Sequence, residues 1–364
     1  MKKNLRLEDF NYELPNNLIA QYPAKKRSES RLLNVDLSNE KNLNFEELSF
    51  VDLASRLKKD DLLIFNNSSV IPAKLDCIKS SGGSVEILIT NKLQNDKENT
   101  YFCNAMLKPS KKISLGQKLK IKGSSETFTV IESDLKSENN FVLEFKNPID
   151  HILKNFGIVP LPPYIKRQPE KQDYIDYQNI FATSPGSIAV PTAGLHFDNF
   201  VFDKLVDKGI KYEFVTLHVG IGTFQPIRVD NIARHEMHSE FCSVSIDCAE
   251  AINEAIRKNR RIIAVGTTSL RVLESLALIE IQEKSHIKSI SPRSWRTNLY
   301  IKPGFEFQIV SGLITNFHLP KSTLLILVST FLGHETCMRA YKEAIKKEFR
   351  FFSFGDAMMA IKPQ

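Results

Sequence analysis

The chain has 364 residues, 42% hydrophobic and 25% charged, so we expect a soluble globular protein large enough for two or three domains. The start MKKNLRLEDFNYELP lacks the apolar core of a signal peptide, and no apolar run approaches the ~20 residues of a membrane span. Five scattered cysteines without a CxxC pair argue for reduced thiols in a cytoplasm and against a disulfide framework or a zinc knuckle, whereas the net charge of +7 is compatible with a polyanionic partner.

The first 66 residues combine an irregular polar segment with one buried strand. Four cations gather near Tyr22 in this segment: Lys25, Lys26, Arg27 and Arg31. They form either a solvated loop or a surface that contacts phosphates, which would position a nucleic acid without reading its sequence. The run Asp61–Asn66 (DLLIFN) contains four consecutive apolar residues, typical of a central strand covered on both faces.

Residues 70–152 change to short alternating strands separated by turn residues. The runs are AKLDCIK, SVEILITN, TYFCNAML, KLKIKG, TFTVIES and FVLEFK, and no helical period of useful length lies among them. This pattern predicts a small antiparallel barrel or sandwich inserted after a strand of another domain, with the proline-rich residues 157–167 as a stiff return linker. Some of its lysines crowd two neighbouring strands, where they either protect a sheet edge or contact RNA: Lys108, Lys111, Lys112, Lys118, Lys120 and Lys122.

The stretch Ser187–Phe197 (SIAVPTAGLHF) predicts a strand end, a turn and a helix start. Residues 188–190 are typical of the end of a buried strand, and Pro191 forces a turn because it cannot donate a ladder hydrogen bond. Asp198 then caps a helix that ends at Gly209.

Thr192, Gly194 and His196 consequently lie in a loop near a helix N-terminus. Ligands of α/β proteins bind at such places, because backbone N–H groups and the helix dipole point there. Alternatively, Thr192 and His196 only satisfy backbone groups within a tight loop.

The run Tyr212–Val219 (YEFVTLHV) alternates as a strand, and a Gly-x-Gly turn follows it. Two glycines let a backbone pass close to a ligand, although a bulge explains them equally well. The strand and its loop contain four candidate positions for ligand contact: His218, Gly220, Gly222 and Thr223.

The segment HEMHSE contributes His238 and Glu240 before the alternating run CSVSID. Two histidines and two glutamates raise the possibility of a metal site. The HxxH spacing differs from the HExxH spacing that places two imidazoles and a base on one helix face, and no third ligand is marked. We therefore expect no metal.

A helix through Arg257 is expected to begin with a capping box made by Asp247 and Glu250. Next, RIIAVGTTS predicts a buried strand, a glycine and two threonines before an amphipathic helix, Leu270–Ile281. Thr267, Thr268 and the free N–H groups of that helix would suit a carboxylate or a ribose hydroxyl, unless Thr268 or Ser269 simply caps the helix. Arg271 lies in its first turn.

The segment TNFHLPKSTLLILVSTFLG places Asn316 and His318 before an apolar helix that we expect Pro320 to initiate. Three histidine-bearing loops, those of His196, His218 and His318, are thus predicted to meet on one side of a sheet.

Several of these segments together resemble one enzyme family. PTAGLHF, TLHVGIGTF, HEMHSE, IAVGTTSLR, LITNFHLPKSTL and RFFSFGDAM, with FNYELPNNLIAQYP, GIVPLPPYIKR and the GGSVEIL hairpin, are similar to the S-adenosylmethionine:tRNA ribosyltransferase-isomerases of queuosine biosynthesis. The similarity runs in order from Leu7 to Ile361. Asn67, Ser68 and Ser69 depart from it, since they replace the usual Asp, Thr and Arg, so we assign no charged role there. Val190 and Ile221 also replace alanines, small changes of volume that we expect to affect packing more than chemistry.

The resemblance implies an α/β domain interrupted by a small inserted antiparallel β-barrel domain. We expect residues 1–66 and 157–364 to form the α/β domain and residues 70–152 the barrel. The family transfers the ribosyl part of S-adenosylmethionine to 7-aminomethyl-7-deazaguanine at the tRNA wobble position, forms epoxyqueuosine, and releases adenine and methionine. S-adenosylmethionine would be a co-substrate with no permanently bound cofactor or metal, tRNA the partner, and the enzyme a cytoplasmic monomer that does not bind a membrane.

Such chemistry needs a base for the proton beside the sulfonium, a proton donor for departing adenine, and donors for the ribose oxygens. Imidazoles suit the proton transfers, because their usual pKa is near neutrality. The catalytic candidates are His196, His218, His238 and His318, with Glu240 as the orienting partner of one of them. Which histidine is base and which is acid stays open. The candidates for substrate binding are Thr192, Gly194, Gly220, Gly222, Thr223, Thr267, Thr268, Arg271 and Asn316, and those for tRNA binding are Lys25, Lys26, Arg27 and Arg31.

Two other classes of protein compete with this interpretation. A methyltransferase would also use S-adenosylmethionine, but the expected glycine-rich turn after an early strand and the acidic residue after the next strand are not evident. A tRNA-binding module without catalysis would need the basic residues but not the buried polar loops.

Overall fold

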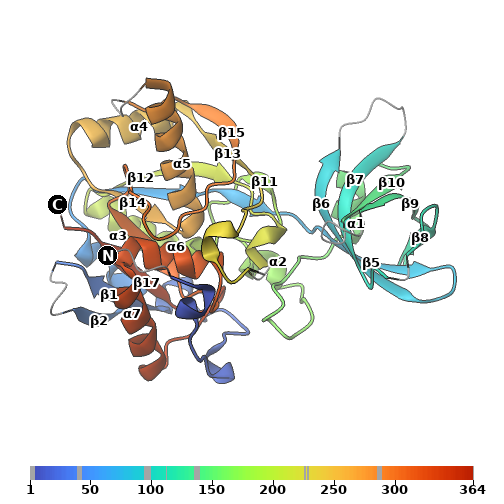
Figure 1. The fold of residues 1–364 in the computed structure, drawn as a ribbon, viewed down its shortest axis with the longest axis horizontal. Coiled ribbons are helices and arrows are strands. Elements are labelled where there is room, and N and C mark those ends of the chain that lie inside the picture. The colour runs from blue at the N-terminus through green and yellow to red at the C-terminus, as the bar shows by residue number, and fades with distance from the viewer. Residues whose placement is uncertain are drawn as a thin grey trace. The chain divides into compact units, whose positions relative to one another are not determined.

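The structure, a computed structural model, describes residues 5–38, 43–93, 100–111, 113–134, 140–224, 227, 229–284 and 289–363. The chain divides into two compact units. The α/β unit comprises residues 1–69, 163–167 and 178–364, and the barrel unit comprises residues 70–162 and 168–177. Figure 1 shows the elements of both units, each of which is described by itself below.

The α/β unit is built on a nine-stranded mixed sheet in the order β15-β13-β12-β3-β14-β16-β17-β1-β2. Its strands are β1 (Arg31–Asp36), β2 (Asn44–Ser49), β3 (Leu62–Asn66), β12 (Lys211–Leu217), β13 (Glu240–Val244), β14 (Ile262–Val265), β15 (Arg293–Thr297), β16 (Gly312–Asn316) and β17 (Ala357–Ile361). Every residue of β3 is buried, which confirms the predicted central strand and explains its unbroken apolar run.

Four neighbouring strands, β12, β3, β14 and β16, run parallel, so their carboxyl ends meet at one edge of the sheet. β13 and β17 run antiparallel to β12 and β16 and therefore begin at this edge, as does β1, which is parallel to β17. We call this the carboxyl edge. At the opposite edge the buried Arg261 donates two hydrogen bonds to Asp61, at 2.8 and 2.5 Å, and so ties the beginnings of β14 and β3 together.

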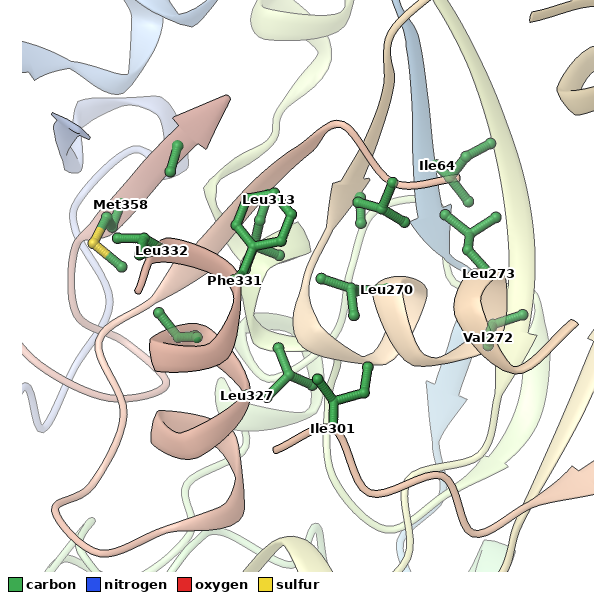
Figure 2. Packing of buried hydrophobic residues seen from close by; sticks show 14 of the residues in the cluster. Ile64, Leu270, Val272, Leu273, Ile301, Leu313, Leu327, Phe331, Leu332 and Met358 are labelled. Carbon is green, nitrogen blue, oxygen red and sulfur yellow. The ribbon is translucent and has the colours of Figure 1, made fainter. Parts of the chain in front are cut away.

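Helices α4 (Ile246–Arg257), α5 (Thr267–Lys284), α6 (Thr323–Leu332) and α7 (His334–Lys346) cover one face of the sheet, the helical face. Figure 2 shows Leu270 of α5 and Phe331 of α6 among the residues that pack with Ile64 and Leu313 of the sheet. The 3-10 helices η4 (Phe50–Arg56) and η5 (Thr192–His196) and helix α3 (Asn199–Asp207) contribute to the core on the other face, the α3 face. Successive strand residues point to opposite faces, so each strand serves both cores.

The predicted strand at residues 188–190 is wrong. These residues are buried but irregular, and the regular pairing lies earlier, where β11 (Ser184–Ser187) forms a separate two-stranded sheet with β4 (Ser68–Val70). Ile188 N donates to the Val219 carbonyl, 2.9 Å away, and Val219 N donates to Ser187 Oγ at the same distance. The apolar run thus packs across the end of β12 and does not continue a ladder.

Helix starts were predicted with mixed success. Asp198 caps α3 as expected, because its Oδ1 accepts from Val201 N at 3.0 Å. The cap of α4 is Ser245, two residues before Asp247, and the cap of α6 is Ser322, which lies after Pro320. In both helices a serine oxygen satisfies a free N–H group of the first turn, a role that neither predicted residue fills.

The barrel unit contains all six predicted strands, closed in the order β10-β7-β6-β5-β8-β9. They are β5 (Lys74–Lys79), β6 (Ser84–Leu93), β7 (Tyr101–Lys108), β8 (Lys118–Ile121), β9 (Thr127–Asp134) and β10 (Asn140–Phe145). The sequence pattern missed helix α1 (Ile149–Phe156), whose Ile149, Ile152 and Leu153 join the barrel core. Its eight residues are too few for a clear helical period.

The boundaries of the units differ from the expected ones. Residues 157–162 and 168–177, assigned above to the α/β domain, belong to the barrel unit together with α2 (Asp173–Asp176). Ile158 and Lys74 exchange backbone hydrogen bonds of 2.8 and 3.1 Å, so the extended linker adds a bridge to β5. The inserted segment is longer than residues 70–152, and its independent folding stays a prediction.

The remaining short elements are η1 (Leu7–Phe10), η2 (Asn16–Leu18), η3 (Arg27–Glu29), η6 (Ile221–Phe224) and η7 (Ile232–Arg234). No helix in the described part of the chain is both long and apolar enough to cross a bilayer. All five cysteines are buried and none forms a disulfide; burial raises the pKa of Cys77 and of Cys103 to about 12, which keeps both thiols protonated.

Candidate active site

The carboxyl edge gathers candidate residues from segments that are far apart in the sequence. β12 ends directly before His218, β14 ends directly before Gly266, and Asn316 is the last residue of β16. Glu240 begins the antiparallel β13 at the same edge. Because parallel strands deliver their following loops to one side, this edge is where an α/β sheet binds ligands.

His196, the last residue of η5, is buried and packs beside Phe50, with ring centroids 5.0 Å apart. Its Nδ1 lies 2.8 Å from Oγ of Ser30. Ser30 Oγ donates its own proton to the carbonyl of Arg27, 3.1 Å away, so it accepts the bond from His196 and Nδ1 holds the ring proton. Nε2 consequently carries the lone pair. It is buried and makes no hydrogen bond of close geometry within the described residues, although the Asn316 side chain lies near enough to hydrogen-bond the protonated ring.

Burial lowers the pKa of His196 to about 3. The guanidinium of Arg350 acts in the same direction, the side-chain amide of Asn316 opposes it, and Arg27 adds to the lowering. The imidazole is therefore neutral at neutral pH and lies in a positive field. A neutral ring with a bare Nε2 can accept a proton or a hydrogen bond from a ligand.

The first turn of α5 lies against η5 at Gly266. A Cβ atom on Gly266 would meet the Ala193 Cβ and the Thr268 Oγ1, each 3.5 Å away, and the residue has a φ of +93°, which favours glycine. Thr268 Oγ1 and Asn316 Oδ1 are buried without partners in the part of the chain that the structure describes. The amide nitrogen of Asn316 fixes the orientation of this side chain, because Nδ2 donates to the Phe352 carbonyl at 3.0 Å.

Arg271, one turn after Thr268 on α5, forms a buried ion pair with Glu240. Nη1 of Arg271 donates to one Glu240 oxygen and Nε donates to the carbonyl of Leu299 at 3.1 Å, while the other Glu240 oxygen accepts from Gly220 N at 2.9 Å. Glu240, which was expected to orient a histidine, thus has its two carboxylate oxygens engaged by Arg271 and Gly220. Nη2 of Arg271 is buried and has no partner among the described residues.

Buried polar atoms are normally hydrogen-bonded, so unpaired ones at a single edge call for an explanation. Four of them belong to residues that the sequence singled out for this site: His196 Nε2, Thr268 Oγ1, Arg271 Nη2 and Asn316 Oδ1. They offer one lone pair, one hydroxyl, one charged donor and one amide acceptor. A polar ligand bound at this edge would offer partners to those of the four atoms that face it.

His218 follows β12, and burial lowers its pKa as well. Its Nδ1 lies 2.7 Å from Oγ of Ser68, and its ring stacks on Phe241 with centroids 5.4 Å apart. A Cβ atom on Gly186 would lie 2.8 Å from the His218 Nε2, so only glycine leaves the ring this position. Ser68 is one of the three consecutive residues that depart from the family pattern, and its hydroxyl contacts the ring of His218.

The other two departing positions make neutral hydrogen bonds. Asn67 accepts from Thr216 Oγ1 at 2.8 Å and donates to Thr183 Oγ1 at 3.2 Å, while Ser69 Oγ accepts from Gln178 at 2.9 Å. An amide and two hydroxyls thus fill the segment without any charge.

The remaining candidates differ in what they contact. Gly194 leaves no room for a side chain, because a Cβ atom there would lie 2.6 Å from Asn179 Nδ2. A Cβ atom on Gly222 would likewise lie 2.6 Å from the exposed ring of His238. Thr192 begins η5 and Thr267 begins α5, both at the carboxyl edge. Thr223 belongs to η6, and its side chain lies outside the described part of the structure.

His318 lies apart from this group. Burial lowers its pKa to about 3, and its Nε2 is 2.8 Å from Oγ1 of Thr315. Thr315 alternates with Asn316 along β16 and shares the helical face with Leu313. The backbone of His318 contacts Tyr12 and Tyr341 on that face. His318 thus packs on the helical face, whereas His196 packs on the α3 face, and the meeting of the three histidine-bearing loops at the carboxyl edge stays a prediction.

The four predicted tRNA-binding cations are not equivalent. Lys25 and Lys26 are exposed, whereas Arg27 is half-buried and donates to the Gln178 carbonyl at 2.7 Å. Arg31 is engaged on several sides, since it pairs with Glu47 at 2.7 Å and its guanidinium carbon lies 3.9 Å from the centroid of the Phe349 ring.

Two residues that act on His196 were not predicted from the sequence. Ser30 orients the ring, and Arg350 contributes positive charge. Arg350 is the first residue of the motif RFFSFGDAM, but only the tertiary structure shows that its charge acts on His196. No group of three or more metal-ligating side chains that could hold an ion occurs within the described ranges.

Three comparisons relate the chain to known proteins. The family model described as "Queuosine biosynthesis protein" matches residues 7–360. An S-adenosylmethionine:tRNA ribosyltransferase-isomerase of Ralstonia nicotianae is 42% identical over 360 residues, which are 99% of this chain and 96% of that protein. A crystal structure of the S-adenosylmethionine tRNA ribosyltransferase of Thermotoga maritima matches with a TM-score of 0.54 at 32% identity, and the match covers 97% of this chain and all of the other.

Proposed function

From the premise that this chain belongs to the queuosine biosynthesis protein family, we propose that it modifies the wobble nucleotide of tRNA. It is a transferase-isomerase that uses S-adenosylmethionine. The ribosyl moiety passes to 7-aminomethyl-7-deazaguanine and rearranges, giving epoxyqueuosine-tRNA, adenine and methionine. S-adenosylmethionine is consumed as a co-substrate, and the enzyme acts in the cytoplasm as a monomer without a permanently bound cofactor.

The observation that supports this proposal most strongly is the group of unpaired buried atoms at the carboxyl edge. Arg271 Nη2 and Thr268 Oγ1 are donors suited to the ribose hydroxyls, on which negative charge grows as bonds rearrange. Asn316 Oδ1 is an acceptor suited to a hydroxyl or an amino group. All three belong to rigid elements, β16 and the start of α5, so their positions are set before the ligand arrives.

His196 is the proposed base. The sulfonium acidifies the adjacent ribose carbon, and the proton of that carbon passes to the bare Nε2 of His196. The positive field of Arg350 and Arg27 weakens this base in the free protein. A substrate anion beside these guanidinium groups would cancel part of the field and raise the pKa of His196, which makes the base stronger once substrate is bound.

His218 is the proposed proton donor or hydrogen-bond partner for departing adenine. It is less buried than His196 and is held by Ser68 from one side. His238, exposed beside Gly222, is a weaker candidate for the same role, and His318 is left with a packing role on the helical face.

The tRNA is proposed to contact Lys25, Lys26 and Arg27, with Arg31 as a lesser contributor because Glu47 compensates its charge. The lysines on the barrel unit offer a second basic surface, which includes the exposed Lys118 and Lys120 of β8. Phosphate contacts of this kind position RNA and carry no sequence information.

Product analysis tests the proposal. Purified protein is incubated with S-adenosylmethionine and with tRNA carrying 7-aminomethyl-7-deazaguanine, and the released small molecules are separated. Adenine and methionine in equal amounts support the transferase-isomerase. S-adenosylhomocysteine would indicate a methyltransferase, and the absence of any product together with tight tRNA binding would indicate a binding module.

A further inference from the structure

Tyr22 exposes an aromatic ring in a basic loop of the α/β unit. The residue is 52% exposed. The guanidinium carbon of Arg167 lies 4.1 Å from the centroid of the Tyr22 ring, which is a cation–π contact. Tyrosine and arginine thus form a layered pair with one aromatic ring at the surface.

Hydrogen bonds hold the backbone on both sides of this ring. The side chain of Gln21 donates to the Tyr164 carbonyl at 3.0 Å and accepts from Lys166 N at 2.7 Å. Arg167 Nε donates to the Gln21 carbonyl at 3.1 Å, and Arg350 Nη1 donates to the Tyr22 carbonyl at 3.3 Å. The loop is therefore ordered before any partner binds, so binding to it costs little additional conformational entropy.

Cations outnumber anions around the ring, where Glu29 pairs with Lys26 at 3.7 Å and Asp356 lies 3.8 Å from Arg350. Lys25, Lys26 and Lys166 are exposed, and Arg27 is half-buried. Arg350 connects this loop to the catalytic candidates, because the residue that donates to the Tyr22 carbonyl also acts electrostatically on His196. A single residue, Arg350, thus contacts the backbone of Tyr22 and acts on the proposed base.

We propose that Tyr22 and Arg167 form a stacking platform for an unpaired base of the RNA next to the nucleotide being modified, with Arg350 and Arg27 facing the intervening phosphate. The inference rests on the proposed function. The Nε2 of His196 is buried, so the modified base must leave its stack to reach it, and its neighbour loses a stacking partner. An aromatic ring flanked by cations is the chemistry that replaces such stacking in single-stranded RNA.

A matched control exists within the same unit. Phe200 on α3 is 55% exposed, and Nζ of Lys204 lies 4.9 Å from its ring centroid. Its helix also carries Asp203 and Asp207, so the surface around Phe200 is less suited to RNA. Loss of the Phe200 ring should leave RNA binding unchanged.

The test compares Tyr22→Ala, Tyr22→Phe and Phe200→Ala in binding an anticodon stem-loop that carries 7-aminomethyl-7-deazaguanine, with 2-aminopurine at the neighbouring position. Removing the ring should raise the Kd about 5- to 150-fold, the equivalent of one lost base stack of about 1–3 kcal/mol. It should also abolish the quenching of 2-aminopurine on binding. Tyr22→Phe keeps the ring and should stay within about twofold of the unmodified protein. The salt dependence of the Kd should be the same for all three variants, because none changes a charge.

If Tyr22→Ala shows the Kd and the quenching of the wild-type protein, and the wild-type protein releases adenine, the stacking platform is refuted and the proposed function stands. An equal loss in Phe200→Ala would also overturn it, since the effect would then not be specific to Tyr22. An unmodified protein that releases no adenine would refute the proposed function, which the RNA-binding data alone do not test. Thermal unfolding of each variant shows that the exposed substitutions leave the fold intact.

Discussion

Nδ1 of His196 lies 2.8 Å from Oγ of Ser30, a residue 166 positions earlier in the chain. The Ser30 hydroxyl also donates to the Arg27 carbonyl, and this bond fixes its direction. The contact therefore selects the tautomer of His196 in which Nε2 is free, and it joins the proposed base to the basic segment that is expected to bind tRNA.

Replacing Ser30 by Ala should slow adenine release by about 10- to 100-fold, because the ring loses its orientation and its preferred tautomer. Ser30→Thr, which keeps the hydroxyl, should recover part of the rate. The matched control is Ser55→Ala on η4, which removes an exposed hydroxyl bound to the Asp52 carbonyl. Equal rates for Ser30→Ala and Ser55→Ala would show that the Ser30 hydroxyl does not position the base.

Acid should destabilise the protein through its buried histidines. The pKa of His196 and the pKa of His318 are both lowered to about 3 by burial, below the ~6.5 of an unfolded chain. Between pH 6.5 and 3 the unfolded state binds more protons, so the free energy of unfolding falls as the pH falls through this window. From pH 7 to pH 5 each histidine should account for roughly 2 kcal/mol.

Urea unfolding at pH 7 and at pH 5 measures this loss. His318→Gln, on the helical face, should remove about half of the histidine contribution and flatten the pH dependence. An unchanged slope in that variant would mean that His318 is not kept neutral by burial.

The effects of substituting Arg271 and Glu240 on stability should be strongly coupled, because both side chains of this ion pair are almost completely buried, at 5% and 6% exposure. Glu240→Gln leaves the Arg271 charge unpaired and should cost about 3–5 kcal/mol of stability. Arg271→Leu should cost a similar amount, whereas the double substitution should cost less than the sum. A double-mutant cycle in urea measures the difference, and strict additivity would contradict a coupled pair.

Charge removal at the N-terminal loop should weaken tRNA binding. Substituting Lys25, Lys26 and Arg27 together by Gln should reduce the salt slope of binding by roughly one unit for each phosphate that the protein no longer neutralises, and adding Arg31→Gln should change it little. Filter binding over a range of salt concentrations measures the slope, and affinity for S-adenosylmethionine serves as the control. An unchanged slope in the triple variant would show that the loop is only solvated surface.

Local patterns in the sequence were sufficient for the elements that depend on local physics. Alternation and turn residues located all six barrel strands, the apolar run of DLLIFN located β3, and Asp198 was recognisable as a helix cap. Helix α1 was missed because eight residues carry little periodicity. Residues 188–190 were wrongly predicted as a strand because a short apolar run has the same sequence pattern whether it pairs in a sheet or packs as an irregular segment.

The contacts within the site depended on tertiary structure. The partner of His196 at Ser30, the charge of Arg350 and the pairing of Glu240 with Arg271 all join residues that are distant in the sequence. The position of His318 also depended on a tertiary contact. Thr315 and Asn316 are consecutive strand residues whose side chains point to opposite faces, and only the structure shows that His318 bonds to Thr315.

The rate of adenine release by His196→Ala tests the account most directly. Saturating S-adenosylmethionine and tRNA are used, and an unfolding curve and a tRNA Kd are measured on the same protein. If Nε2 takes the proton beside the sulfonium in a rate-limiting step, turnover should fall by ~100-fold or more while the variant stays folded and binds tRNA normally. A folded His196→Ala protein with full activity would contradict the assignment and leave His218 as the better candidate for the base.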